Sequence, residues 1–317
     1  MAPQSYYLGG KIRASDYNGF ADDINEIVGI GAGDSGYGQN QLVIPHVASG
    51  TKINASHMQL LLTALKFAGR HQGTTINSPE DTNDPDFPSA GQIIKLLPNL
   101  EVDITNVRAN KLNFDIAQMT AESNKISSSK TFDVPGAGAV HTWSANVNYE
   151  VSVIFADADA RRHFFNTGSD LRIDTSLTGV DASHKQSVDW QTMFSNIGIL
   201  KLSHNVTEAT GGVGTPAGGF TSLTSTYAKI YEKSGGDGSS GYYTNNQFEV
   251  YARLNGNNAI DFKLDFIDAY TTSTFNLTDY VAGTLTVQLD LLRADDQDAS
   301  GNGVVITSPT FSHISQL

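Results

Sequence analysis

The chain has 317 residues, a formal net charge of −13 and no cysteine. Without cysteine it forms no disulfide, thiolate zinc site or iron–sulfur cluster, and without a cluster of Lys and Arg it lacks the charge that binding to nucleic acid requires. Only 17% of the residues are charged and 30 are glycine, a composition that suits turns and polar sheet faces better than a helical enzyme.

We expect a protein that is not inserted in a membrane. The N-terminus has neither the basic region nor the apolar run of a signal peptide. No window of the sequence approaches the length of a membrane-spanning segment.

Three helices are predicted in the N-terminal part, because apolar residues recur there at spacings of three and four. Ser15 or Asp16 is expected to cap the first helix, which ends before Gly29. The second is expected to start near Asn54 or Ser56 and to end around 69–73, and a third pattern covers 100–107. Three prolines within 74–91 predict a loop.

Two features near these helices resemble functional motifs. A Gly-x-Gly-x-x-Gly string lies at Gly31, Gly33 and Gly36, but it follows a helix rather than a strand, so we predict a flexible turn instead of a phosphate loop. His57 and His71 are too far apart for a metal pair at i and i+4. We therefore predict surface or capping roles for both histidines.

The periodicity changes to two from Thr131 onward, after a stretch rich in Ser and Lys at 123–130 that we expect to be a domain junction. Asn255-Gly-Asn-Asn258 predicts a tight hairpin between two strands. The expected strands are 142–155, 170–177, 199–206, 225–233, 242–254, 259–268 and 283–293. A helix capped by Ser187 and ended by Gly198 interrupts them, with an apolar face made by Trp190, Met193, Phe194 and Ile197.

Helices followed by strands predict an α+β protein. We expect a helical attachment or oligomerisation region at 1–125 and a mostly antiparallel β-sandwich at 126–317.

The stretch from Ala156 to Ile173 lies between two alternating strands and is expected to form the crossover between two sheets. Asp157 or Asp159 can cap a short helix there. Arginines 161, 162 and 172 are expected to pair with acidic neighbours. The expected structural anchors of the fold are Phe164, Phe165, Gly168 and Trp190.

The sequence shows no catalytic, cofactor-binding or metal-binding constellation. Asp296, Asp298 and Ser300 match the first half of a calcium loop, but Thr307 stands where the bidentate Glu belongs, so we predict a polar turn. The acidic cluster at 81–86 is interpreted in the same way.

A glycosidase uses a pair of carboxylates to cleave the glycosidic bond. Glu150, Asp157 and Asp159 are the candidates for such a pair in this sequence. Helix capping and pairing with arginine explain these residues more simply.

Two glycine-rich loops at 211–219 and 235–241 are long enough to carry binding contacts or to order against a neighbouring subunit. Tyr242 and Tyr243 follow the second loop and are the candidates for stacking on a sugar.

The stretch Ala160-Arg-Arg-His-Phe-Phe-Asn-Thr-Gly-Ser-Asp-Leu-Arg-Ile173 resembles a pattern of virion structural proteins from tailed bacteriophages, including cyanophages. It departs from that pattern at His163 and Ser169. Further segments are similar to the same family along nearly the whole chain, namely Ile12–Asn18, Gly36–Gln39, His71–Gly73, Trp190, the strand at Tyr227, Tyr243–Tyr251, Gly283–Val287 and Pro309–Ser312.

The resemblance implies a non-enzymatic component of the virion, associated with the tail, neck or baseplate as a fibre or collar protein, assembled in the host cytoplasm. It implies a homo-oligomer whose partners are other virion proteins, and it brings no cofactor and no active site. The alternative is a host-surface carbohydrate-binding adhesin in which Tyr242 and Tyr243 contact the glycan. A glycoside hydrolase using Glu150 and Asp157 is a third hypothesis.

Overall fold

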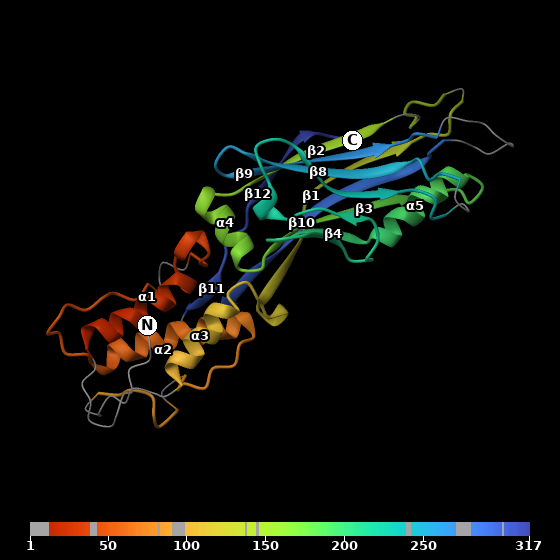
Figure 1. Cartoon of the computed structure of the whole chain (residues 1–317). Coiled ribbons are helices and arrows are strands. Elements are labelled where there is room, and N and C mark those ends of the chain that lie inside the picture. The colour runs from red at the N-terminus through yellow and green to blue at the C-terminus, as the bar shows by residue number, and fades with distance from the viewer. Residues whose placement is uncertain are drawn as a thin grey trace. The chain divides into compact units, whose positions relative to one another are not determined.

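Figure 1 shows the computed structural model, which describes residues 13–38, 43–80, 83–90, 99–136, 138–143, 146–238, 242–270, 280–299 and 301–317. The chain divides into two compact units. The first comprises Met1–Thr120, Arg162–Gly168 and Arg293–Thr307, and the second comprises Ala121–Arg161, Ser169–Leu292 and Ser308–Leu317. The predicted division after residue 125 did not include the two later returns of the chain to the first unit.

The first unit is built on three helices that pack against one another, α1 (Ala14–Val28), α2 (Ala55–Gln72) and α3 (Leu100–Ala109) (Figure 1). The short strand β11 (Gly303–Val305) lies against α2 and pairs with the end of β10. Helical spacing places apolar side chains in the centre. The buried set includes Tyr17, Ala21, Ile24, Ile27, Leu61, Leu65, Ile104 and Val107.

The helix termini show how the local sequence sets the boundaries. The predicted cap of α1 was wrong, because Arg13 is the capping residue and its backbone N–H donates to Asp16 at 3.2 Å. The predicted start of α2 is confirmed, because the Asn54 side chain accepts the N–H of His57 at 3.2 Å and the His57 ring accepts the N–H of Asn54. His57 therefore has the predicted capping role.

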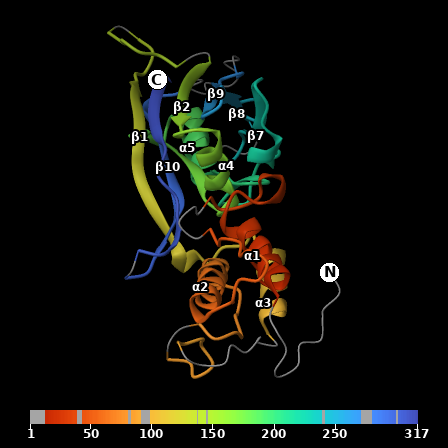
Figure 2. The same ribbon diagram turned by 90° about the vertical axis from the view of Figure 1, so that its left-hand side faces the viewer.

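The second unit contains two mostly antiparallel sheets, which confirms the predicted α+β class with sandwich-like sheets (Figure 2). One sheet has the order β1 (Met119–Phe132), β10 (Gly283–Gln297), β3 (Asp170–Thr178), β4 (Ile199–Leu202) and β5 (Thr207–Ala209). The other has the order β12 (Thr310–Ser315), β2 (Val147–Ile154), β9 (Ala259–Ile267), β8 (Gln247–Asn255), β7 (Ala228–Ser234) and β6 (Thr215–Pro216).

The strand β1 occupies the stretch at 123–130 that was expected to be a domain junction, and the two units divide just before it, between Thr120 and Ala121. β1 is an edge strand beside β10, as Figures 1 and 2 both show. Its exposed face carries hydroxyls instead of apolar side chains, which hides the alternation in the sequence. Ser129 and Thr131 bond through these hydroxyls to Thr286 and Thr284 of β10, at 2.8 and 2.9 Å.

The hairpin at 255–258 is confirmed. β8 and β9 pair in antiparallel register from Gln247 opposite Ile267 to Asn255 opposite Ala259. Gly256 has φ +58°, the left-handed conformation that such a turn needs.

Helix α5 (Lys185–Ile197) brings its apolar face to an aromatic core, as predicted. The Trp190 ring lies 5.0 Å from the Trp143 ring, and Phe194 lies 5.9 Å from Phe266 of β9. The predicted cap was wrong, because His184 precedes the helix and Ser187 is buried inside it. The Ser187 hydroxyl accepts the N–H of Ala282 at 2.9 Å instead.

The predicted crossover is confirmed, because the chain leaves β2 of one sheet, forms α4 (Ala158–Asn166) and enters β3 of the other. Asp157 caps α4 by accepting the N–H of Ala160 at 2.7 Å. Gly168, with φ +76°, turns the chain from the helix into β3. The helix contributes residues up to Arg161 to the second unit and the remainder to the first.

Candidate functional site

Three segments that the sequence analysis singled out meet in the first unit. They are the turn at 34–38, the end of α2, and the end of α4 with the two residues after it. Side chains from each segment bond to another segment, and most of these side chains are buried. We call Tyr37, His71, Gln72, Asn166 and Thr167 the buried polar cluster.

Asn166 joins α4 to the turn. Its side-chain amide donates to the carbonyl oxygens of Asp34 and Gly36, both at 2.9 Å. Only 1% of Asn166 is exposed. A buried amide that reaches two backbone carbonyls fixes the position of the turn, because leaving those carbonyls unbonded would cost free energy.

His71 joins α2 to the end of α4. Its Nε2 atom donates to the carbonyl of Thr167 at 3.0 Å, and its ring meets the Tyr37 ring edge-on at 5.2 Å. The predicted surface or capping role of His71 was wrong, since none of it is exposed. Among the described residues, no partner bonds to Nδ1.

Burial sets the protonation of His71. Loss of hydration lowers the pKa of the imidazole from 6.5 to about 4, although the Thr167 carbonyl and the charge of Asp115 act in the opposite direction. The ring is therefore neutral at physiological pH, with its proton on Nε2.

Gln72 and Tyr37 complete the cluster. The Gln72 amide donates to the Tyr37 hydroxyl at 2.8 Å and to the Val107 carbonyl at 3.0 Å, while the Tyr37 hydroxyl donates to the Lys111 carbonyl at 2.7 Å. Burial raises the pKa of Tyr37 above its usual value, so the phenol stays protonated. These bonds tie the turn to α2, to α3 and to the segment after α3.

Close packing explains the glycines of the turn better than ligand binding does. A Cβ on Gly36 would lie 2.1 Å from the carbonyl oxygen of Gly29. The predicted turn at 31–36 is thus present, and the short 3-10 helix at Ala32–Asp34 lies within it. Gly168 is equally constrained, because a Cβ there would lie 2.2 Å from the Phe114 ring.

The other expected anchors are buried as well. Phe164 and Phe165 are 0% exposed, with their rings edge-on at 5.1 Å. Trp190 is also fully buried. Phe164, Phe165 and Trp190 are therefore packing residues of the core.

Tyr242 and Tyr243 do not form the expected pair of stacking platforms. Tyr242 is 56% exposed, but Tyr243 is buried and its ring packs edge-on against Tyr270 at 4.8 Å. The strand β8 begins only at Gln247, so the two tyrosines lie in a turn, where neighbouring side chains need not share a face.

In the residues that the structure describes, both glycine-rich loops form hydrogen bonds with other segments of the same chain. Gly211 donates to the Ile197 carbonyl at 3.0 Å, and Tyr231 donates to the Val213 carbonyl at 2.9 Å. In the second loop the buried Asp189 carboxylate accepts the N–H of Gly236 at 2.9 Å and of Gly238 at 2.8 Å. Residues 239–241 lie outside the described part.

The candidate glycosidase carboxylates have separate structural contacts. Asp157 caps α4, and Asp159 lies exposed in its first turn. Glu150 lies opposite Lys263 in the register of β2 and β9 and accepts the Tyr227 hydroxyl at 3.5 Å.

The arginines of the central stretch differ in their partners. Arg172 pairs with Asp170 at 2.6 Å and Arg162 approaches Asp34 at 3.6 Å, as expected. The expectation for Arg161 was wrong, because it donates to the Ala259 carbonyl at 2.9 Å.

The segment that matches the first half of a calcium loop contains a turn, in which the Gly301 N–H donates to the Asp298 carbonyl at 3.0 Å. Asp296 is only 5% exposed and is bound by Arg70 of α2 at 2.7 Å, which neutralises its charge. Ser300 lies outside the described residues, as does Asp81 of the other acidic cluster. Among the residues that the structure describes, this segment included, no three His, Asp or Glu are placed to hold a metal ion.

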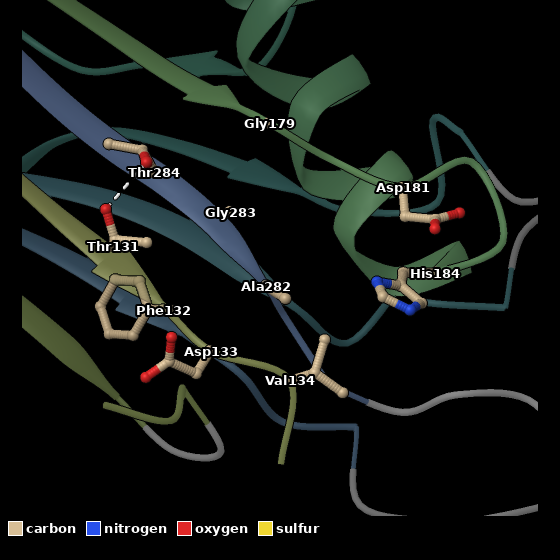
Figure 3. Close-up of a pocket in the computed structure, with 10 residues that line it drawn as sticks. All are labelled: Thr131, Phe132, Asp133, Val134, Gly179, Asp181, His184, Ala282, Gly283 and Thr284. Atoms are coloured by element: carbon tan, nitrogen blue, oxygen red, sulfur yellow. Dashed lines mark hydrogen bonds between the residues drawn. The ribbon is translucent and has the colours of Figure 1, made fainter. Parts of the chain in front are cut away.

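Sequence reasoning missed a pocket of about 400 Å³ in the second unit, at one end of β1, β3 and β10 (Figure 3). No motif marks it, because its polar side chains come from three separate segments of the chain. Its lining comprises Thr131, Phe132, Asp133, Val134, Gly179, Asp181, His184, Ala282, Gly283 and Thr284.

No protein-family model matches this chain, and neither a curated protein nor a solved structure matches it significantly. Within the part of the chain that the structure describes, every helix lacks the length and apolarity needed to cross a bilayer.

Proposed function

We propose that this chain is a non-enzymatic structural component of a tailed-phage virion, a fibre, neck or baseplate-associated protein that self-assembles and docks on the tail. The observation that carries the proposal is the buried polar cluster. Its residues belong to the segments whose sequence resembles virion structural proteins, and they bond those segments into one unit.

The chemistry of the cluster favours a structural role. A catalytic histidine needs contact with a substrate and a pKa near the working pH, whereas His71 is fully buried and held neutral. The side-chain amide of Asn166 donates to two backbone carbonyls, and that of Gln72 donates to a backbone carbonyl and to the Tyr37 hydroxyl. The residues that carry the resemblance thus stabilise the folded structure of the first unit, as we expect of a protein whose function is assembly.

Labelling of particles tests the proposed place of the chain. Antibodies raised against the purified chain, applied to phage from cells that make this protein, should decorate one fixed position at the tail, neck or baseplate in electron micrographs. Unlabelled intact particles, together with chain that sediments apart from them, would contradict the proposal.

A further inference from the structure

We infer that the pocket in Figure 3 is a binding site for a neutral sugar ring, built at the end of a hydroxyl-lined face of the second unit. This inference assigns a ligand class to a site that the proposed virion role leaves unexplained. Its volume of about 400 Å³ lies in the range of small-molecule sites.

Two carboxylates supply acceptors for sugar hydroxyls. One oxygen of Asp133 accepts the N–H groups of Val140 and His141 at 2.9 and 3.1 Å, and one oxygen of Asp181 accepts the N–H and hydroxyl of Ser183 at 2.8 and 2.7 Å. Among the described residues, no hydrogen bond reaches the second oxygen of either carboxylate. Each carboxylate is thus held through one of its oxygens, and its second oxygen is left to accept a further hydrogen bond.

The same hydrogen bonds favour the ionised form of both groups. The amides of His141 and Val140 lower the pKa of Asp133, and the amide and hydroxyl of Ser183 lower the pKa of Asp181. A charged carboxylate is a stronger acceptor for a hydroxyl than a neutral oxygen. His184 lies near Asp181, and its Nε2 atom bonds to the Tyr280 hydroxyl at 2.8 Å.

A face of neutral hydroxyls adjoins the pocket. Thr131 and Thr284 line the pocket, and their hydroxyls bond to each other at 2.9 Å. Thr178 of β3 lies opposite Thr284 of β10 in the register of the two strands. The next row repeats the pattern with Ser129, Thr286 and Ser176. Side chains in such rows share one face of the sheet, so the pocket opens onto a polar surface along which a longer glycan can lie.

The charge of the lining selects among ligands. None of the ten residues that line the pocket is Lys or Arg, so phosphate, sulfate or an acidic sugar would meet two carboxylates without a basic partner. A metal ion is disfavoured, since the described residues hold no group of three His, Asp or Glu with suitable placement. Val134, which is 48% exposed, adds apolar surface beside the polar groups, a combination typical of small-molecule sites.

A glycan array tests the inference with the full chain and four variants. Asp133→Asn and Asp181→Asn remove the charge but keep an oxygen that can accept the loop N–H groups, and Val134→Arg blocks the pocket at its rim. Glu208→Gln, on an exposed position of β5, is the matched control. The probes are neutral oligosaccharides of glucose, galactose, mannose and N-acetylglucosamine, with sialylated and sulfated glycans for comparison.

The expected result is binding to at least one neutral glycan that falls about 10-fold or more in the three pocket variants, while the control and all thermal melts stay unchanged. Three results would overturn the inference: no neutral glycan bound, binding indifferent to the pocket variants, or stabilisation by calcium chloride that depends on Asp133 or Asp181. Particle labelling and glycan binding are separate measurements, so failure of one leaves the other intact.

Discussion

The side-chain amide of Asn166 donates to the backbone carbonyl of Gly36 at 2.9 Å, although the two residues are 130 positions apart. The same amide also reaches the Asp34 carbonyl, so one side chain from α4 fixes a turn near the start of the chain. This contact links the end of α4 in the central stretch to the turn at 34–38.

Substitution of Asn166 should therefore be costly. Asn166→Ala leaves the buried Gly36 carbonyl and the partly buried Asp34 carbonyl without this donor, and we expect a loss of about 2 kcal/mol in the free energy of unfolding. Asn166→Asp should cost more, because a carboxylate would face two carbonyl oxygens. Urea denaturation measures both, with Asn245→Ala at an exposed turn as the control. A loss below 0.5 kcal/mol, or about equal to that of the control, would show that the contact is dispensable.

His71 should make stability depend on pH. Its folded pKa of about 4 lies below the ordinary 6.5, so the unfolded chain binds more protons between these values. Stability is fully present above pH 6.5 and falls as the pH drops toward 4, by roughly 3 kcal/mol over the window. His71→Gln keeps a donor for Thr167 and should flatten this part of the profile. If stability depended on pH in the same way in the native chain and in the variant, the lowered pKa assigned to His71 would be contradicted.

Gly168 and Gly179 form a matched pair. Both have left-handed backbones, with φ of +76° and +68°, but a Cβ would meet the Phe114 ring only at Gly168 and has open space at Gly179. Gly179→Ala should cost about 1 kcal/mol from backbone strain alone. Gly168→Ala should cost clearly more, measured by denaturant titration. Equal costs would mean that Phe114 yields to the added methyl group.

Phe165→Ala should destabilise the chain by about 3 to 5 kcal/mol, because truncation of a fully buried aromatic ring leaves a cavity. Tyr242→Ala is the control, since more than half of that side chain is exposed and the change should stay within about 0.5 kcal/mol. Thermal melts distinguish the two. A melt unchanged by Phe165→Ala would place the central stretch at the periphery of the fold.

Local signals in the sequence predicted much of the fold. The Asn-Gly turn at 255–258 and the helical spacing around Trp190 each depend on a few adjacent residues, and both features are present in the structure. The strand β1 was missed because its outer face carries Ser, Thr and Lys. These side chains find hydroxyl partners on β10, which comes more than 150 positions later in the chain.

The candidate sites were less predictable, because their contacts join distant segments. His71 lies three residues beyond Ala68 on the buried side of α2, so its burial was visible in the helical spacing. Its partner Thr167 was not, since nothing in the local sequence pairs the two. Asp133, Asp181 and Thr284 of the pocket likewise come from three strand ends that only the sheet brings together.

Self-association is the most direct test of the proposed structural role. Size-exclusion chromatography with multi-angle light scattering on the full chain, over a wide range of concentrations, measures the mass of the species in solution. We expect a symmetric homo-oligomer with a mass that is a whole multiple of 34.0 kDa and that forms more completely as the concentration rises. A mass of one chain at every concentration would contradict the account.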